Sequence, residues 1–116
     1  MSNYKENRPW GSFENLLDES YCKVKRIIIP SGGQPSYQYH HRRSEVWTIV
    51  QGRATVTLDD KELIFEEGQV VKVPQGVKHR VKNNDEQDLI FIEVQTGTYF
   101  GEDDIVRIED DYGRTS

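Results

Sequence analysis

The sequence lacks the features on which several classes of protein depend. Cys22 is its single cysteine, which excludes an internal disulfide and a zinc site built from several cysteines. No apolar run approaches the roughly 20 residues that a membrane helix needs, and the polar start MSNYKENRPW has no signal-peptide core. We therefore expect a cytoplasmic protein with no membrane partner, in which Cys22 is a small buried side chain in a strand.

Length and charge narrow the class further. A chain of 116 residues is expected to form a single domain, 1–116, around one core. The 20 acidic residues outnumber the 15 basic ones and give a formal net charge of −5, which repels the phosphates of nucleic acids. Binding of DNA or RNA is therefore not expected, whereas a few convergent arginines can still hold the single phosphate of a small ligand.

Apolar and polar residues alternate with a period of two along most of the chain. The pattern recurs in short segments, most of them closed by a turn signal: 21–30, 46–52, 53–60, 61–68, 69–76, 77–84 and 88–97. Strands of this number and spacing predict an all-β sandwich or barrel. Near the C-terminus, GEDDIVRIEDDYGR (101–114) is compatible with a short helix, because its first acidic residues would lie at the helix N-terminus.

A polar cluster, QYHHRRSEVW, occupies residues 38–47. Gln38 and His40 share one face of an extended chain, but His40 and Glu45 are five residues apart and would lie on opposite faces of an unbroken strand. They converge only if residues 41–44 form a turn or a bulge. Glu45 also shares a face with Trp47, so its carboxylate is expected to be buried and to need a cation or a metal ion beside it.

The third histidine of the chain, His79, lies in a separate alternating stretch. Val77, His79 and Val81 alternate with basic residues and are expected to point inward. A histidine on an apolar face is either a hydrogen-bonded core residue or a ligand. The alternation alone leaves both interpretations of His79 open.

Together these two stretches resemble the paired motifs of the cupin superfamily. The second stretch resembles the second cupin motif at its fixed positions, which are Gly68, Pro74, Gly76, His79 and Asn83. The first resembles the first motif from Gly33 through His40 and Glu45 to Gly52, with Gln38 in place of the first histidine. The resemblance implies a cupin double-stranded β-helix, a jelly-roll barrel, followed by a short helical or irregular C-terminal segment.

A narrower resemblance covers residues 8–114. The stretches RPWGSFE (8–14), PQGVKHRV (74–81) and VQTGTYFGEDDIVRIEDDYGR (94–114) are similar to the C-terminal cupin domain of type II mannose-6-phosphate isomerase/mannose-1-phosphate guanylyltransferase. Arg42 and Val46 stand where that family often has histidines. The chain has no Gly-rich nucleotide loop, so guanylyltransferase activity is not expected.

The resemblance implies one divalent metal ion. Its ligands would be Gln38, His40, Glu45 and His79, a mixed nitrogen and oxygen set that suits Zn²⁺, Mn²⁺, Fe²⁺, Co²⁺ or Ni²⁺ without selecting among them. Fewer protein ligands than the ion needs would leave positions for substrate oxygens. His41 is adjacent to His40 and is expected to point elsewhere, as a solvated or supporting residue.

The implied activity is a metal-dependent interconversion of mannose 6-phosphate and fructose 6-phosphate that feeds polysaccharide synthesis. Its proton transfer needs a base, for which Glu93 is a candidate, although Glu93 points inward only if Ile92 and Val94 face outward. We place Glu93 and Arg114 among the catalytic residues. The predicted substrate-binding residues are Arg43, Arg107 and Tyr112.

Two other functions remain open. A non-catalytic cupin that binds a sugar or sugar phosphate, as a sensor or accessory protein, would keep the cavity and lack turnover. A metal-dependent dioxygenase is also built on this fold, and oxygen uptake would reveal it. In each case we expect a homodimer, because a lone barrel has sheet edges to cover.

Overall fold

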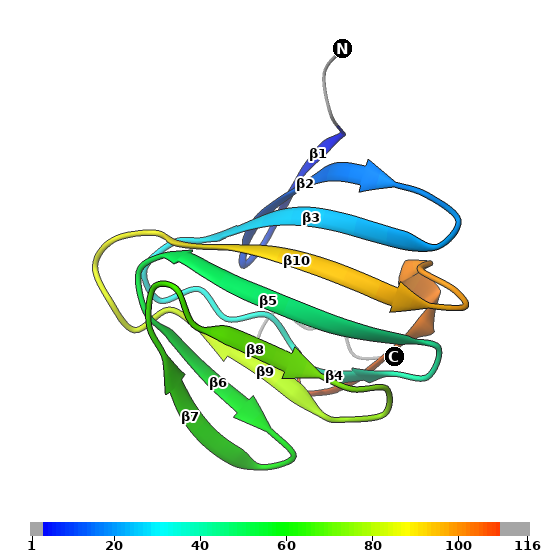
Figure 1. The fold of residues 1–116 in the computed structure, drawn as a ribbon. Coiled ribbons are helices and arrows are strands. Elements are labelled where there is room, and N and C mark those ends of the chain that lie inside the picture. The colour runs from blue at the N-terminus through cyan, green and yellow to red at the C-terminus, as the bar shows by residue number, and fades with distance from the viewer. Residues whose placement is uncertain (1–3, 110–116) are drawn as a thin grey trace.

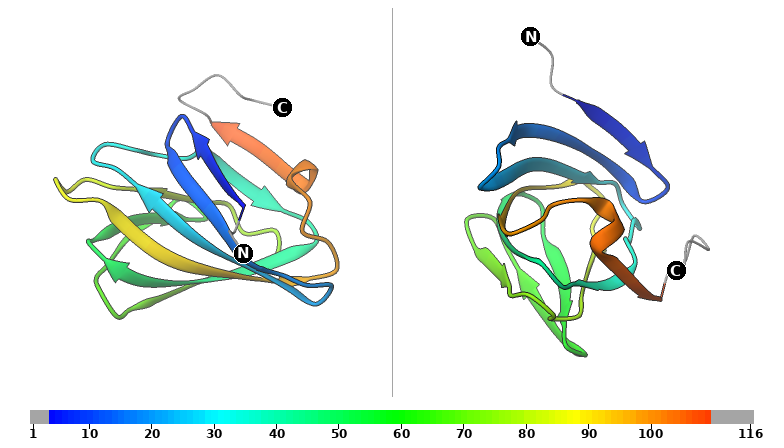
Figure 2. Two further views of the ribbon diagram at one scale, coloured as in Figure 1. Left: turned by 90° about the horizontal axis from the view of Figure 1, so that it is seen from above. Right: turned by 90° about the vertical axis from the view of Figure 1, so that its right-hand side faces the viewer.

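Two antiparallel β-sheets make up residues 4–109, the part of the chain that the computed structural model describes (Figure 1). The six-stranded sheet has the order β1 (Lys5–Arg8), β2 (Gly11–Asp18), β3 (Cys22–Ile29), β10 (Leu89–Gly97), β5 (Arg43–Gln51) and β8 (Val70–Val73). The five-stranded sheet has the order β11 (Ile105–Glu109), β4 (Tyr37–His40), β9 (His79–Lys82), β6 (Ala54–Leu58) and β7 (Lys61–Phe65). The two sheets curve around a common interior, as the end-on view in Figure 2 shows.

The alternation of side chains decides which residues enter that interior. Strand β10 lies between β3 and β5 in the larger sheet, so it has strand neighbours along both edges. Its residues Phe91, Glu93 and Gln95 are buried, whereas Ile92 and Val94 lie on the partly exposed outer face. The inward face of this central strand therefore changes from apolar to polar along its length.

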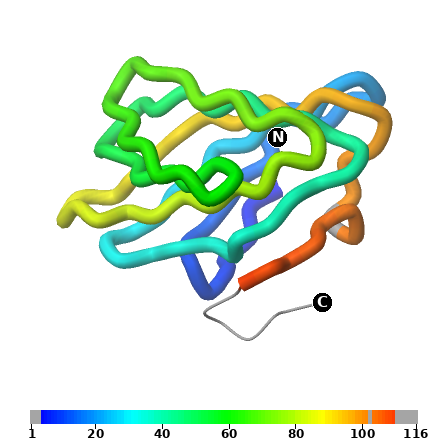
Figure 3. Tube along the Cα trace, turned by 90° about the horizontal axis from the view of Figure 1, so that it is seen from below, coloured from blue at the N-terminus to red at the C-terminus, as the bar shows by residue number. Residues whose placement is uncertain are grey.

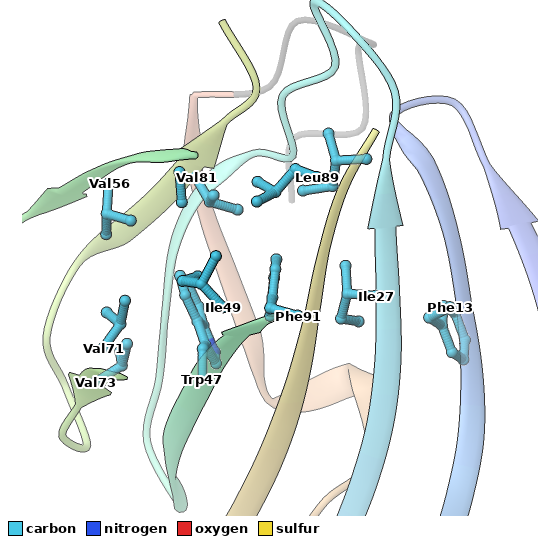
Figure 4. Packing of buried hydrophobic residues seen from close by; sticks show 12 residues of the cluster. Phe13, Ile27, Trp47, Ile49, Val56, Val71, Val73, Val81, Leu89 and Phe91 are labelled. Atoms are coloured by element: carbon cyan, nitrogen blue, oxygen red, sulfur yellow. The ribbon is translucent and has the colours of Figure 1, made fainter. Parts of the chain in front are cut away.

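The apolar half of the interior is filled by side chains from both sheets (Figure 4). The rings of Trp47 and Phe91 pack with their centroids 5.0 Å apart, and Ile49 beside them is 1% exposed. Val56 and Val81 approach from the smaller sheet. Burial of each such side chain contributes about 1.5–3 kcal/mol to folding, so this cluster is a main source of the stability of the barrel.

The extended conformation is interrupted by a bend at His41 and Arg42, between β4 and β5. This break in the strand is the turn that the sequence required for His40 and Glu45 to face each other. Gly97, at the end of β10, allows the close approach here, because a Cβ at this position would lie 2.2 Å from the carbonyl oxygen of Arg42. The N–H of Thr98 donates a hydrogen bond of 3.0 Å to the same oxygen.

The C-terminal part of the described chain is mainly a strand. The expected helix is limited to a single 3-10 turn, Glu102–Asp104, and β11 follows it directly. Strand β11 pairs with β4, and Figure 3 shows the orange-to-red segment returning alongside the chain near residue 40. The β-branched residues of IVRIE favour a strand, and the open edge of β4 gives this strand a partner.

Cys22 begins β3 and is only half-buried, so the prediction of a buried side chain is wrong, because the strand end leaves it near solvent. Within residues 4–109 no helix has the length and apolar composition required to cross a membrane.

Two neighbouring residues of β5 provide a test of the core. Ile49→Ala should lower the free energy of unfolding by about 2–5 kcal/mol, because it opens a cavity at a fully packed position. Val50→Ala, at a residue that is 49% exposed, should change it by about 0.5 kcal/mol or less. Chemical denaturation of both variants measures the difference, and equal losses would contradict the assigned register of β5.

Candidate metal centre and active-site cavity

The polar half of the interior contains a cavity of about 100 Å³ between the two sheets, partly open to solvent. Its wall includes Gln38, Glu45 and His79 from the predicted ligand set, together with Glu93. Basic side chains also line it: Arg8, Lys25, Arg43, Arg80 and Arg107. Most of the residues singled out from the sequence thus reach one cavity from strands far apart along the chain.

Glu45 presents a fully buried carboxylate to this cavity, with 3% exposure. Trp47 Nε1 donates a hydrogen bond of 2.9 Å to its Oε1, and Arg43 Nε donates one of 2.9 Å to its Oε2. Burial on its own raises the pKa of this carboxyl, but the contact with His40 and the positive charge of Arg43 hold the pKa well below its usual range. Glu45 is therefore ionised and acts as a buried anion.

His40 is turned toward Glu45 by the break after β4. Its Nε2 lies 3.2 Å from Glu45 Oε2, and its Nδ1 lies 3.4 Å from the carbonyl oxygen of Asp104. The Asp104 carboxylate accepts hydrogen bonds from the backbone N–H groups of His41 (3.3 Å) and Arg42 (2.9 Å). Asp104 thus satisfies the backbone of the break and supports the imidazole orientation that directs Nε2 inward.

His79 offers the clearest ligand geometry in the described part of the chain. Its Nδ1 lies 3.0 Å from the carbonyl oxygen of Val77, which places the ring hydrogen on Nδ1. Burial lowers the pKa of His79, although the charge of Glu45 opposes the shift, so the ring is neutral. Its Nε2 is buried and has no hydrogen-bond partner among residues 4–109, which leaves a lone pair directed into the site.

The three side chains together fit a metal ion. Ligand atoms of His40, Glu45 and His79 all lie within 4.8 Å of one another, and the two imidazole centroids are 5.1 Å apart. The set provides two nitrogens and one carboxylate oxygen, which suits a first-row divalent cation. An unpartnered buried nitrogen is costly in the absence of a ligand, and a cation at this point would satisfy it.

Gln38, the fourth predicted ligand, lies on β4 directly across from His79 of β9. It lines the same cavity, but its Oε1 accepts a hydrogen bond of 2.7 Å from the hydroxyl of Ser36. The amide is therefore placed at the cluster with its oxygen already engaged. Ser36 was not predicted from the sequence. The one feature that points to it is its position two residues before Gln38, which places both side chains on the same face of the chain.

Arg43 lies in the cluster itself, and it is 4% exposed. In addition to its hydrogen bond with Glu45, its Nη2 is 3.2 Å from His40 Nε2. The guanidinium therefore links two of the predicted ligands and balances the buried carboxylate. Its charge is directed at the centre where a metal ion is expected.

Glu93 points inward, which answers the question that the alternation left open. It is 7% exposed and faces Trp47 across the β10–β5 pair and Lys25 across the β10–β3 pair. Burial raises the pKa of Glu93 to about 8, the charge of Glu45 adds to this, and Lys25 opposes it. Gln95 Nε2 donates a hydrogen bond of 2.7 Å to its Oε2.

The remaining predicted site residues fall into two groups. Arg107 of β11 lines the cavity and pairs in register with Gln38. Tyr112 and Arg114 lie outside the described residues.

Sequence reasoning missed four charged residues at or beside the cavity. Arg8, Lys25 and Arg80 line it from the strands β1, β3 and β9, and Asp104 supports His40. Lys25 alternates inward with Ile27 in KVKRIII, which was an available signal. Nothing local to Asp104 distinguishes it from the acidic residues beside it, because its partners are about sixty positions away in the chain.

Solved structures similar to this chain share its fold. The capsular polysaccharide assembling protein CapF from Staphylococcus aureus matches with a TM-score of 0.80 at 21% identity, over 94% of this chain and 32% of that one. An RmlC-like cupin from Shewanella frigidimarina matches with a TM-score of 0.74 at 22% identity, over 87% of each chain. The predicted fold class, an all-β cupin jelly-roll barrel, is therefore confirmed.

The family follows from sequence similarity. A family model described as the C-terminal region of mannose-6-phosphate isomerase matches residues 2–110, and the chain belongs to this family. The xanthan biosynthesis protein XanB of Xanthomonas campestris is 48% identical over 96% of this chain and 24% of its own length. Alginate biosynthesis protein AlgA of Pseudomonas aeruginosa is 45% identical over 94% of this chain and 23% of its own.

A mannose-1-phosphate guanylyltransferase of Klebsiella pneumoniae is 39% identical over 97% of this chain and 25% of its own length. The chain thus spans about a quarter of the length of these relatives.

Asp104 provides a test of how the centre is built. Asp104→Ala should lower the free energy of unfolding by about 1–3 kcal/mol, because two backbone N–H groups at the break lose their acceptor. The matched control is Asp103→Ala in the same turn, at an exposed residue, with an expected change of about 0.5 kcal/mol. Denaturant unfolding measures both variants. Equal effects of the two changes would refute the stabilising role of the hydrogen bonds from His41 and Arg42 to Asp104.

Proposed function

We propose that this chain is a metal-dependent sugar-phosphate isomerase that interconverts mannose 6-phosphate and fructose 6-phosphate. The observation that carries the proposal is the buried carboxyl of Glu93, which faces the same cavity as the His40–Glu45–His79 cluster. Moving a proton between two adjacent carbons requires a group that accepts and returns it beside a group that stabilises charge on the neighbouring oxygens. Family membership supports the same activity.

His40, Glu45 and His79 would hold the metal ion, with Gln38 beside them. Bound there, a divalent ion would stabilise the negative charge that develops on the substrate oxygens. The histidines would bind through Nε2, since the Nδ1 atoms face the carbonyl oxygens of Asp104 and Val77. The donor set leaves the choice among Zn²⁺, Mn²⁺, Fe²⁺, Co²⁺ and Ni²⁺ to experiment.

Glu93 would serve as the base that carries the proton between C1 and C2. Gln95 fixes its Oε2 through a hydrogen bond, and Trp47 and Phe91 border the same cavity and exclude water around it. A carboxyl held in this way has a defined position relative to the substrate carbons. Arg114 stays a predicted catalytic residue, and Tyr112 a predicted substrate-binding one.

The charges of the cavity support an anionic substrate. Five basic side chains line it, Arg8, Lys25, Arg43, Arg80 and Arg107, against the carboxylate of Glu45 and the carboxyl group of Glu93. This excess is opposite in sign to the net charge of −5 on the whole chain, so the cavity is a local region of positive potential. We propose that a cytoplasmic homodimer acts on this sugar phosphate to supply polysaccharide synthesis, as the relatives' names indicate for their own pathways.

A non-catalytic sugar-phosphate binding protein is the second candidate, and the position of Arg43 favours it. The guanidinium already balances the charge of Glu45 and contacts His40, so the buried carboxylate needs no metal ion and the other basic side chains of the cavity can hold an anion. Binding of mannose 6-phosphate after chelation, with no turnover after Zn²⁺, Mn²⁺, Co²⁺ or Ni²⁺ is restored, would select this candidate. Turnover restored by one of these ions would select the isomerase.

His79→Ala tests the metal centre. Removing the imidazole should weaken metal binding by more than about 100-fold, beyond the effect of losing a supporting contact, and isomerase activity should fall with it. Metal content by mass spectrometry and turnover of mannose 6-phosphate are measured on the same preparations. His41→Ala, at an exposed histidine, is the control and should retain both. Activity that persists without metal would contradict the mechanism.

Glu93→Gln tests the base. The amide keeps the shape of the side chain and cannot accept the proton, so kcat should fall about 100- to 10,000-fold. Metal content should stay near the wild-type value, because the variant keeps all three ligand side chains, His40, Glu45 and His79. Wild-type kcat in this variant would exclude Glu93 as the base and leave the metal centre unaffected.

A further inference from the structure

Two basic side chains converge on one aromatic ring at the side of the cavity formed by β1, β2 and β3. Lys25 Nζ lies 4.3 Å from the centroid of Phe13, and Arg8 Cζ lies 5.6 Å from it. All three residues line the cavity. Arg8 also pairs with the carboxylate of Glu6, which is partly exposed.

Lys25 is the unusual member of this group, because it is a lysine with only 3% exposure. Burying an ammonium group is costly unless other groups compensate for the lost water. The Phe13 ring provides a cation–π contact, and Glu93, its cross-strand neighbour, interacts with its charge. A costly charge in a cavity wall is a candidate for ligand binding.

The position of Lys25 relative to the metal cluster matches an elongated ligand. Strand β10 separates β3, which carries Lys25, from β5, which carries Glu45. Two strand spacings place the backbones of β3 and β5 about 10 Å apart. An open-chain six-carbon sugar phosphate has its phosphate at the end opposite the carbons that react, so it needs a cationic site at such a distance from the cluster.

Arg43, in contrast, is poorly placed for the phosphate. Its Nε and Nη2 contact Glu45 and His40 within the cluster. A phosphate bound at Arg43 would compete with the metal ion for the same space and with Glu45 for the same hydrogen-bond donors. The phosphate-binding cations are therefore expected elsewhere in the cavity.

We propose that Lys25 and Arg8, held at the ring of Phe13, form the phosphate-binding end of the cavity. The phosphomonoester of the ligand accepts hydrogen bonds from Lys25 Nζ and the Arg8 guanidinium, and the sugar extends past Glu93 toward His40, Glu45 and His79. That the ligand is mannose 6-phosphate rests on the proposed function. The binding of a phosphomonoester at Lys25 does not depend on turnover.

Lys25→Met tests this site, since methionine keeps an unbranched chain and removes the charge. Calorimetric titration with mannose 6-phosphate should show a Kd raised about 10- to 100-fold, as expected for the loss of a charge-assisted hydrogen bond. Metal content should be unchanged. The control is Arg26→Met, at an adjacent outward-facing residue that pairs with Glu14, and its Kd should stay within about twofold of wild type.

Further variants and titrations distinguish phosphate binding at Lys25 from the proposed isomerase reaction. Lys25→Arg should recover most of the affinity, and Arg8→Met, at a side chain that is 33% exposed, should also weaken binding and avoids disturbing the core. Titration with inorganic phosphate and with mannose identifies which part of the ligand Lys25 recognises. Loss of affinity for phosphate-bearing ligands alone supports the site.

Each outcome decides one claim. Wild-type affinity of Lys25→Met and Arg8→Met for mannose 6-phosphate would overturn the phosphate site, and the isomerase would stand if the wild-type chain turns over. Lys25-dependent binding of inorganic phosphate without any turnover of mannose 6-phosphate would uphold the phosphate site and reject the proposed function.

Discussion

A buried carboxylate determines how the interior of this barrel is arranged. Glu45 is ionised at 3% exposure, and its burial would cost several kcal/mol without nearby donors. Trp47, Arg43 and His40 surround it at 2.9 to 3.2 Å. His40 can reach it only because the chain breaks after β4, and that break is stable because Asp104 accepts the exposed backbone N–H groups. The need to compensate the buried charge of Glu45 thus accounts for the bend after β4, for the position of Asp104 beside it and for the grouping of the candidate metal ligands.

The same need explains why the cavity differs in charge from the rest of the molecule. The chain as a whole is acidic, yet basic side chains predominate along the cavity. Charges held in a recess with apolar walls act on a ligand more strongly than charges on the surface, because less water lies between them. A small anion is therefore attracted to the cavity although the net charge of the whole chain is negative. This contrast agrees with a phosphorylated sugar as the ligand and explains how net charge and binding preference can differ in sign.

Much of this arrangement could be predicted from the sequence, for identifiable reasons. Alternation gave the strands of the central sheet, since Trp47 and Ile49 must face a core, and it required a break between His40 and Glu45. Alternation could not place Glu93, because Phe91 on one face of the strand and Ile92 on the other are equally apolar. When the outer face of a sheet also carries apolar residues, the local sequence does not show which face is buried. Strand register decides it, through Trp47 and Lys25 on either side.

The residues that sequence reasoning missed depend on long-range pairing. β11 is a strand because β4 has an open edge, and only this pairing brings Asp104 beside His40. Lys25 joins the cavity because β3 lies next to β10. Local patterns contain no information of this kind, and motif resemblance transfers the residues of the motif but not those that support them. The motif therefore predicts the candidate ligands, and only the fold reveals the residues that surround them.

Anomalous X-ray diffraction from crystals grown with a divalent transition metal ion would test the central claim most directly. The account predicts one strong peak bonded to His40 Nε2, His79 Nε2 and a carboxylate oxygen of Glu45, at about 2.0–2.2 Å if the ion is Zn²⁺. It also predicts that Arg43 moves away from His40 to admit the ion. Diffraction that shows no peak there, with the His79 Nε2 contacting only protein or water while the ion binds elsewhere, would contradict the account.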